Sequence, residues 1–485
     1  MEDFSWTATV TFLVDLLIRL GLSVRVIMRR RPVGVSLAWL VIVLLVPFLG
    51  AVIYLFVGEL WLGRRRAEWA AKIHGPYEKW LAALCRRTHV DWSAVGQQCE
   101  PIANLIHNVS DMPALPGNRL QLHATPADIF RALVADIDAA GHTCHLEFYI
   151  WNVGGMADEV GEALLRAAAR GVICRVLLDA VGSHPFLHSD WAAKLRKAGV
   201  MLRAALPGGL IRGVFVRYDL RLHRKIVVID GEIAYTGSMN LVDPRYFKQT
   251  AGVGQWIDAM VRLRGPAVQE LAATFIEDWE LETGEGLERL GQTADLHAPP
   301  DRGHAVVQVA ASGPLVQNDA IQQILLMAIY TARKDLVLTT PYFVPEEPLL
   351  MALASAAQRG VAVTIVVPAR VDSRLVRLAS QAHQGDLLLA GARVVLFDGG
   401  LLHTKSITVD GELSLFGSLN LDPRSLHLNF EVTLAVYDAE FTCELRKLQQ
   451  SYIDRSEAMD LEAWQHRPAL VRFTENAARL LGPLL

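Results

Sequence analysis

A polar motif that occurs twice with the same internal spacing most constrains what this chain can fold into. The first copy reads His223-x-Lys225-x4-Asp230-x6-Gly237-Ser238-x-Asn240. The second copy reads His403-x-Lys405-x4-Asp410-x6-Gly417-Ser418-x-Asn420, and the two histidines are 180 residues apart. Because six residue types recur in the same order, a chance match is a poor explanation. We therefore interpret the body of the chain as two similar halves.

Each copy predicts a β-hairpin that gathers polar side chains at one end. A His and a Lys two residues apart on an extended strand project from the same face. The residues that follow, 226–229 and 407–409, are β-branched and mostly apolar, which is typical of a buried strand. Asp-Gly then favours a turn, and the returning strand brings a hydroxyl and an amide back beside the His and Lys. Two such hairpins facing each other would place two imidazoles across one pocket.

Such a pocket suits phosphodiester chemistry. One imidazole can attack phosphorus and the other can protonate the leaving alkoxide, while Lys and Asn side chains hold the non-bridging oxygens. We predict that the catalytic residues are His223, Lys225, Asp230, His403, Lys405 and Asp410. We predict that the substrate-binding residues are Ser238, Asn240, Ser418 and Asn420.

Two points about the acidic residues stay open at this stage. Asp230 and Asp410 can orient a catalytic imidazole, but an Asp before a Gly can equally well make only the hairpin turn. Glu431 is a candidate to hydrogen-bond the histidine of the opposite half.

The repeat extends beyond the motif and indicates the fold class. A strand at 145–151 resembles 336–343, and each is followed by an Ala-rich helix that ends in Arg-Gly and then by a further strand. This alternation predicts α/β domains related by a pseudo-two-fold axis, each with a β-sheet flanked by helices. The expected boundaries are a membrane hairpin at 1–62, a membrane-proximal connector at 63–115, and repeated domains at 116–290 and 303–485.

The N-terminal residues predict a transmembrane helical hairpin. From Pro32 to Gly58 there are 27 residues without a charge, and the mean hydropathy of the chain is +0.26. Insertion of residues 33–57 is favoured by roughly 5–10 kcal/mol. The first arm is weaker because it contains Asp15 and Arg19, although their i,i+4 spacing lets them neutralise each other. We expect helices at about 4–24 and 33–57, with an interfacial helix before a single span as the alternative.

Charge and cysteine content restrict the function classes further. Residues 1–66 hold eight arginines and four acidic residues, so they carry +4, and the remaining chain carries −8 of the total of −4. Basic residues beside the apolar segment can meet anionic lipid headgroups, whereas the acidic body argues against a nucleic-acid binder. The five cysteines are scattered without a C-x-x-C pair, which excludes a disulfide scaffold and disfavours a metal site. They favour a reducing compartment and so a cytoplasmic body.

The double motif resembles the signature of the phospholipase D superfamily, over the body from about residue 120 onwards. The resemblance implies a phosphohistidine intermediate and neither a metal nor an organic cofactor. It also implies that His223 is the nucleophile and that His403 is the general acid and then the general base. The residues themselves do not distinguish the two histidines.

Further segments are similar to bacterial cardiolipin synthases of the phospholipase D type, namely Arg31-Pro32, 236–248, 253–258, 340–343, 420–425 and 429–431. One departure is Leu222, where relatives often carry Asn. The resemblance implies a multi-pass enzyme of the bacterial inner membrane that joins two phosphatidylglycerol molecules into cardiolipin and releases glycerol. A hydrolytic phospholipase D, or another transphosphatidylase, is the alternative, and a non-enzymatic membrane scaffold is disfavoured because both motifs are intact. The sequence predicts no oligomeric state.

Overall fold

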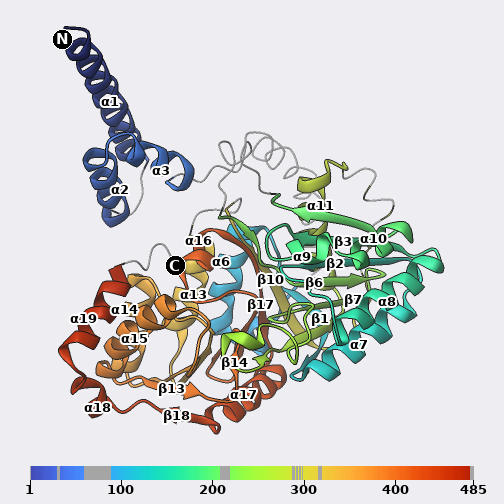
Figure 1. The fold of residues 1–485 in the computed structure, drawn as a ribbon. Coiled ribbons are helices and arrows are strands. Elements are labelled where there is room, and N and C mark those ends of the chain that lie inside the picture. The colour runs from blue at the N-terminus through green and yellow to red at the C-terminus, as the bar shows by residue number, and fades with distance from the viewer. Residues whose placement is uncertain are drawn as a thin grey trace. The chain divides into compact units, whose positions relative to one another are not determined.

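The computed structural model describes residues 2–29, 33–58, 89–207, 219–286, 290, 293, 296–297, 299–314 and 319–480 (Figure 1). The chain falls into two compact units. One consists of residues 1–68 with 208–220, and the other of residues 69–207 with 221–485. The first unit contains the apolar N-terminal helices, and the second contains the repeated body.

The N-terminal unit contains α1 (Glu2–Met28), α2 (Val33–Leu45) and α3 (Leu49–Val57). The prediction of one helix over 33–57 is wrong, because the helix ends before Pro47, whose ring and missing N–H oppose a continuous helix. Asp15 stabilises this break by accepting a hydrogen bond from the backbone N–H of Phe48 at 3.0 Å. Asp15 also forms the expected ion pair with Arg19, which donates to the carbonyl of Leu44 at 2.7 Å.

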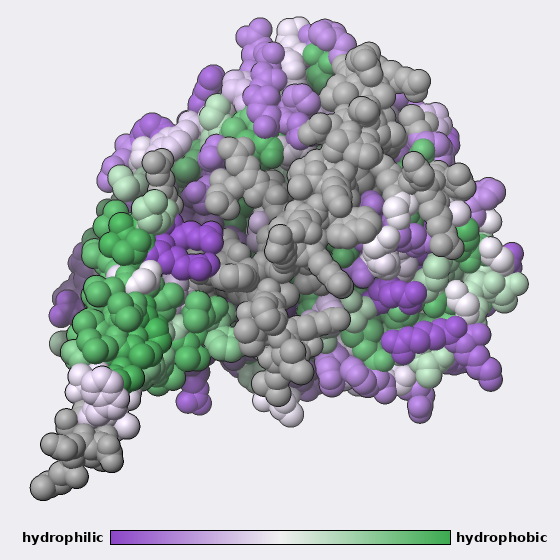
Figure 2. Space-filling model, turned by 90° about the horizontal axis from the view of Figure 1, so that it is seen from above, coloured by the Kyte–Doolittle hydropathy of each residue, from purple (hydrophilic) through white to green (hydrophobic). Residues whose placement is uncertain are grey.

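The surface of these three helices is apolar on most of the side that Figure 2 shows. On α1, for example, Trp6, Phe12 and Leu17 are 71%, 64% and 70% exposed. Within the residues that the structure describes, we find no helix with both the length and the apolar character needed to cross a membrane.

The body is built on a sheet whose second part repeats the strand order of the first. The first half runs in the order β1 (Leu115–His123), β9 (Met260–Arg264), β7 (Ile233–Gly237), β6 (Ile226–Ile229), β2 (Thr143–Phe148), β3 (Ile173–Asp179) and β4 (Met201–Ala205). The second half runs in the order β10 (Ala305–Ser312), β17 (Asn429–Tyr437), β16 (Leu413–Gly417), β15 (Ser406–Val409), β11 (Asp335–Thr339), β12 (Ala362–Pro368) and β13 (Arg393–Phe397), with β18 (Ser456–Ala458) at the edge. Antiparallel pairing of β1 with β10 joins the halves. The motif hairpins are β6–β7 and β15–β16, as predicted.

Helices cover both halves of this sheet (Figure 1). The first half carries α7 (Pro126–Ala139), α8 (Met156–Ala169), α9 (His184–Leu187), α10 (Asp190–Lys197) and α11 (Val268–Thr283). The second half carries α13 (Ala320–Thr331), α14 (Glu347–Gln358), α15 (Arg374–Leu389), α16 (Pro423–His427), α17 (Ala439–Ile453), α18 (Leu461–Gln465) and α19 (Ala469–Leu480). Strand β2, which is parallel to β3 and antiparallel to β6, is buried along its whole length, as expected where helices cover both faces of a sheet. The α/β class and the repeat are thus confirmed.

The segment predicted as a connector is, in its described part, a component of the body. Residues 59–88 lie outside the described residues. The chain then forms α5 (Trp92–Val95), η1 (Gln97–Cys99) and α6 (Glu100–Ser110). Ile102 and Ile106 of α6 are fully buried in the core of the second half, and Gln308 of β10 donates to the carbonyl of Ala103 at 3.0 Å. Apolar burial therefore places α6 in the second half.

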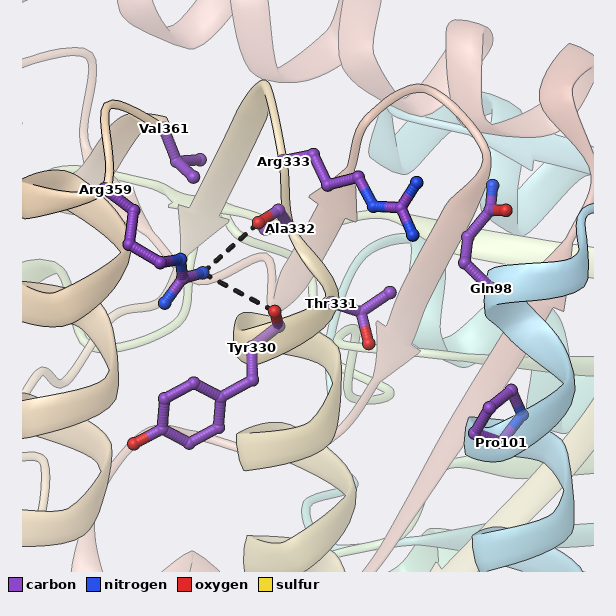
Figure 3. A pocket seen from close by; sticks show the side chains of 8 residues that line it. All are labelled: Gln98, Pro101, Tyr330, Thr331, Ala332, Arg333, Arg359 and Val361. Carbon is purple, nitrogen blue, oxygen red and sulfur yellow. Dashed lines mark hydrogen bonds between the residues drawn. The ribbon is translucent and has the colours of Figure 1, made fainter.

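The arginine of the repeated Arg-Gly pair donates hydrogen bonds to the end of a neighbouring helix in each half. Arg170 donates to the carbonyls of Ile137 and Ala140, at the end of α7, at 3.0 and 3.2 Å. Its counterpart Arg359 donates to Tyr330 and Ala332 at the end of α13, beside a shallow depression (Figure 3). Carbonyls in the last turn of a helix lack the usual i+4 partner, so a guanidinium helps to satisfy them and complements the helix dipole.

Candidate active site

The segment that leads into each motif histidine lies against the opposite half. Strand β5 (Arg221–Leu222) pairs in parallel with the start of β17, and β14 (Leu401–Leu402) pairs in parallel with β8 (Trp256–Ile257). The backbone N–H of His223 donates to the carbonyl of Phe430 at 2.9 Å, and that of His403 donates to Ile257 at 2.8 Å. Each histidine is therefore held next to the residue that follows in the other half, which is Glu431 or Asp258.

Each imidazole is hydrogen-bonded to that carboxylate. Nδ1 of His223 lies 2.8 Å from Glu431, and Nδ1 of His403 lies 2.6 Å from Asp258. All four side chains are buried. A carboxylate only accepts, so Nδ1 carries the proton and Nε2 keeps its lone pair. The expected contact of Glu431 with the opposite histidine is present, and Asp258 is its counterpart, which the sequence analysis missed.

The motif serines hold these carboxylates. The hydroxyl of Ser238 donates to Asp258 at 2.6 Å and accepts from the N–H of Ala259 at 3.1 Å. The hydroxyl of Ser418 likewise donates to Glu431 at 2.5 Å and accepts from Val432 at 3.0 Å. Because the proton of each hydroxyl goes to a carboxylate, the geometry agrees with a positioning role for Ser238 and Ser418. The predicted substrate-binding role of these serines stays a prediction.

Asp258 could be found from the strand pairing of its serine, but not from a fixed sequence separation between the two residues. The N–H of Ser238 pairs with Ala259, and that of Ser418 pairs with Val432, so each carboxylate immediately precedes the partner of its serine. The separation along the chain is 20 residues in the first half and 13 in the second. A search at fixed spacing therefore cannot find the pair, whereas pairing the returning strand with the next strand would.

The two motif lysines are buried in the same cluster. Each ammonium group donates to the carbonyl of its own histidine, His223 or His403. Burial lowers the pKa of Lys225 to about 8 and that of Lys405 to about 7, although both Glu431 and Asp258 oppose this by favouring the charged form. The two lysines are thus affected by the same two carboxylates, and an added anion would stabilise the charged form of both.

Burial also dominates the titration of the histidines. It lowers the pKa of His223 to about 4, against the opposing charge of Glu431. Burial, followed by the positive charge of Lys405, lowers the pKa of His403 to about 4 as well. Both imidazoles are therefore neutral at pH 7, which is the form a nucleophilic histidine requires.

The motif asparagines each keep a polar atom without a partner among the described residues. Asn240 accepts from the N–H of Ile150 at 3.1 Å through Oδ1, while its buried Nδ2 has no partner there. In Asn420 the buried Oδ1 is the atom without one. A buried polar atom without a partner is costly, so these amides fit a ligand-binding position.

Asp230 and Asp410 lie at the far end of their strands and contact neither imidazole. The carboxylate of Asp230 accepts from three successive backbone N–H groups, those of residues 141–143, each at 2.8 Å. Asp410 accepts in the same way from residues 333–335 at 2.7–2.9 Å. Both aspartates also adopt a φ of 52° at the hairpin turn. Of the two readings left open, the geometry agrees with the turn and not with a catalytic carboxylate.

The halves differ in the residue between the motif His and Lys. In the first half Arg224 is buried, pairs with Asp278, and donates to the carbonyls of Glu431 and Ser312, each at 3.1 Å. In the second half the equivalent Thr404 donates to Ile257 at 3.2 Å. Each of these side chains thus bonds the backbone at or beside the opposite carboxylate, with a charge in one half and a hydroxyl in the other.

Of the aromatic residues at the strand ends, some line the histidines and others fill the core. The ring of Tyr149 lies 5.1 Å from that of His223. Trp151 instead stacks on Phe186 in the first core, and Phe343 is buried in the second. The ring next to His403 belongs to Trp256, at 4.3 Å.

Two repeated α/β halves with a His-Lys motif in each define a protein with two phospholipase D-like domains. A family profile described as "Cardiolipin synthase, PLD-like domain" matches residues 133–279 and 325–452, and a second, "Phospholipase_D-nuclease N-terminal", matches residues 17–59. The chain belongs to the cardiolipin synthase family of the phospholipase D superfamily.

Known relatives agree with this assignment. Proteins named cardiolipin synthase A from Yersinia pseudotuberculosis serotype O:1b and from Yersinia pestis are each 46% identical to this chain over 468 residues. The match covers 96% of this chain and 96% of each relative. The crystal structure of a phosphatidylserine synthase from Haemophilus influenzae is similar with a TM-score of 0.59 at 16% identity, covering 79% of this chain and 99% of that one. This second likeness supports the fold alone.

Proposed function

We propose that this protein is a cardiolipin synthase that transfers a phosphatidyl group from one phosphatidylglycerol to another, giving cardiolipin and glycerol. The observation that carries the proposal is the reciprocal pairing of each motif histidine with a carboxylate of the opposite half. It fixes both imidazoles with Nε2 available, which phosphoryl transfer through a covalent intermediate requires. The 46% sequence identity to proteins named cardiolipin synthase A, over 96% of the chain, supports the choice of substrate.

The reaction needs two in-line displacements at one phosphorus. In the first, His403 enters protonated at Nε2 in the substrate complex. Nε2 of His223 attacks phosphorus, the bond to the glycerol oxygen breaks, and Nε2 of His403 gives its proton to that oxygen. In the second, His403 takes the proton from a primary hydroxyl of another phosphatidylglycerol. The new oxygen–phosphorus bond forms as the phosphorus–nitrogen bond breaks, so both histidines return to their starting state.

Lys225, Lys405 and the two motif asparagines would bind the non-bridging oxygens. The cations lie within one buried cluster, and Nδ2 of Asn240 is a donor without a partner among the described residues. Asn420 would bind through its own Nδ2, because Oδ1 only accepts. Burial, followed by the positive charge of Lys405, lowers the pKa of His403. A bound phosphodiester would offset the charge of Lys405, so substrate binding favours the protonated form of this general acid. Asp258 then stabilises the imidazolium through Nδ1.

Lipid product analysis tests the proposal. The purified chain is incubated in detergent micelles with phosphatidylglycerol as the only lipid, and the products are measured by mass spectrometry. We expect cardiolipin and glycerol in equal amounts, and loss of turnover in both His223→Asn and His403→Asn. Phosphatidic acid with glycerol and no cardiolipin would instead assign a hydrolytic phospholipase D, and near-normal activity of either variant would refute the paired-histidine mechanism.

We also propose that the N-terminal helices hold the enzyme at the inner membrane of a bacterium, with the repeated domains, at 116–290 and 303–485, in the cytoplasm. The exposed apolar side chains of α1 and the family match over residues 17–59 support membrane association. The protein should remain in the membrane fraction after an alkaline carbonate wash. Protease protection in spheroplasts then reports the side: cleavage of the body from outside would overturn the cytoplasmic placement.

A further inference from the structure

The two halves differ in the segment that connects the motif asparagine to the carboxylate. This segment is seven residues longer in the first half, from Asn240 to Asp258, than in the second, from Asn420 to Glu431. The first half uses the added length for a loop with one short 3-10 helix, η2 (Gln249–Ala251). The symmetry of the site is therefore broken on one side.

This loop brings a cation to Trp256, the aromatic residue that contacts His403. Nζ of Lys248 lies 5.5 Å from the ring of Trp256, whose ring in turn lies 4.3 Å from that of His403. The backbone of Lys248 is left-handed, with a φ of 47°, a conformation that costs a non-glycine residue about 1 kcal/mol or more and persists only where the surroundings impose it. The position of this lysine is thus specified by the fold.

Lys248 has only a weak partner in this structure. Its side chain is half-exposed, and its ammonium group lies 3.4 Å from Asp372, which is long for an ion pair. The other oxygen of Asp372 accepts a hydrogen bond from the hydroxyl of Tyr342 at 2.9 Å. A phosphodiester, which carries the same single negative charge and can approach the ammonium group more closely, can therefore compete with Asp372 for Lys248.

A second donor lies beside His403. Trp256 is only 4% exposed, and its indole N–H has no partner among the described residues. A buried donor left unsatisfied costs about 1–3 kcal/mol, which a ligand oxygen would recover. The equivalent residue of the second half is Asn429, which donates to Glu431 at 3.3 Å and provides no ring against His223.

We infer that Lys248 and the indole N–H of Trp256 form a second phosphodiester-binding position, which holds the phosphate of the acceptor lipid beside His403. The inference rests on the proposed function, in which the acceptor is itself a phosphatidylglycerol. With its phosphate held there, the three-carbon glycerol headgroup presents a hydroxyl to His403. The proton of this hydroxyl passes to His403 as the hydroxyl oxygen bonds to phosphorus and the phosphorus–nitrogen bond to His223 breaks.

This position would select among acceptors. Water and simple alcohols carry no phosphate, so they reach the phosphohistidine without using Lys248 or Trp256. The position therefore favours transfer to phosphatidylglycerol over hydrolysis, although both reactions share every group of the donor site. It also assigns His403 to the acceptor side.

A competition between two acceptors tests the inference. The full chain is incubated in micelles of phosphatidylglycerol with excess carbon-13-labelled glycerol, which converts the same phosphoenzyme into labelled phosphatidylglycerol. The measured quantity is the ratio of cardiolipin to labelled phosphatidylglycerol. We expect Lys248→Met to lower this ratio about tenfold, because it removes a charge-assisted contact of the lipid acceptor alone.

Three further variants sharpen the result. Trp256→Phe keeps the ring against His403 and removes only the N–H, so it should lower the ratio as well. Lys248→Arg should restore most of it by keeping the charge. Lys197→Met removes an exposed lysine on α10 and should leave the ratio at the wild-type value.

Two outcomes would overturn the inference. An unchanged ratio in both Lys248→Met and Trp256→Phe would mean that neither group contacts the acceptor. A parallel fall of both products would place Lys248 in the shared donor step. If the wild type forms labelled phosphatidylglycerol or phosphatidic acid but no cardiolipin, the proposed function itself fails, which is a separate result.

Discussion

The histidines of this enzyme depend on carboxylates that lie outside the repeated motif. Asp258 and Glu431 each contact the imidazole of the opposite half and are in turn held by a motif serine. The chain Ser–carboxylate–His fixes the tautomer and the orientation of each ring. This arrangement makes the carboxylates positioning residues, whose removal should affect turnover more than folding.

Asp258→Asn and Glu431→Gln should each lower kcat roughly a hundredfold or more while the protein stays folded. The physical reason is that the amide no longer stabilises an imidazolium and can favour the wrong tautomer. Turnover of phosphatidylglycerol by the purified variants, with their near-UV circular dichroism, measures both effects. A kcat within a few-fold of wild type would contradict the positioning role.

Asp230→Asn supplies the matched comparison. The change keeps the shape and the tolerance of a left-handed φ, but it weakens three hydrogen bonds to the backbone of 141–143. We expect a loss of about 1–3 kcal/mol in the free energy of unfolding, with kcat per folded molecule close to wild type. Thermal unfolding beside the same turnover assay checks this, and a large fall in kcat without a fall in stability would restore the catalytic reading.

The lowered pKa values of the two lysines predict how the empty site binds anions. The pKa of Lys225 is about 8 and that of Lys405 about 7, so both lose their charge as pH rises through this range. Sulfate stays a dianion throughout, and the histidines, with pKa values of about 4, stay neutral. The inhibition constant of sulfate should therefore rise about tenfold or more between pH 6.5 and 9. A constant that does not change with pH would contradict the lowered pKa values, and Lys405→Met should flatten the curve.

At this scale the sequence was sufficient for His223, His403 and their lysines, because fixed spacing on a strand determines which side chains share a face. It was insufficient for Asp258, whose place depends on pairing with a strand at a distance that differs between the halves. The contact of each motif serine with a carboxylate could not be predicted for the same reason, since a free hydroxyl and one that donates to a carboxylate look alike in a motif.

Among the elements, the helix ends explain part of the repeat that has no place in the chemistry. Arg359 bonds carbonyls at the end of α13, while the neighbouring Arg333 points into the same depression with no hydrogen bond from its guanidinium among the described residues (Figure 3). The two arginines therefore make a matched pair for measuring what a helix-end contact contributes.

Arg359→Ala should lower the free energy of unfolding by about 0.5–1 kcal/mol, because exposed carbonyls lose a charged donor. Arg333→Ala should change it by less than half of that amount. Parallel thermal denaturation of both variants measures the difference. Equal melting temperatures for the two would show that water replaces the Arg359 contact without cost.

Helices and strands were predicted well where a continuous run of residues is buried, and poorly where a single residue determines where the element ends. Strands β3 and β12 and both motif hairpins follow from β-branched apolar runs. Helix α2 instead ends before Pro47, and Asp15 and Arg19 hold the break through contacts that hydropathy does not record. The short pairs β5–β17 and β8–β14 cannot be read from two-residue strands, because their pairing depends on the assembled halves.

In the whole molecule, the two copies of the repeat form one active site, to which each half contributes a residue that the other needs. Neither half contains a complete Ser–carboxylate–His chain for its own histidine, since Glu431 serves His223 and Asp258 serves His403. The β1–β10 pairing makes the sheet continuous across the repeat. The repeat itself could be predicted from sequence, but this exchange of carboxylates could not, because it depends on how the copies face each other.

A break in the chain between the halves should therefore be tolerated only when both fragments are present. Residues 1–290 and 303–485, each produced alone, should have no measurable turnover, whereas their co-expression should restore cardiolipin formation. Lipid analysis of cells carrying one or both fragments measures this. Activity of a single fragment would show that one histidine can work without the carboxylate of the other half.

The exchanged carboxylates also bear on how the enzyme is made. During synthesis the first half emerges from the ribosome complete with His223 and Lys225, beside a membrane full of phosphodiesters. The imidazole of His223 lacks its carboxylate partner until Glu431 has been translated, more than two hundred residues later. We therefore expect the nascent chain to be inactive, so that the order of its residues protects the bilayer from a half-built phospholipid-cleaving protein.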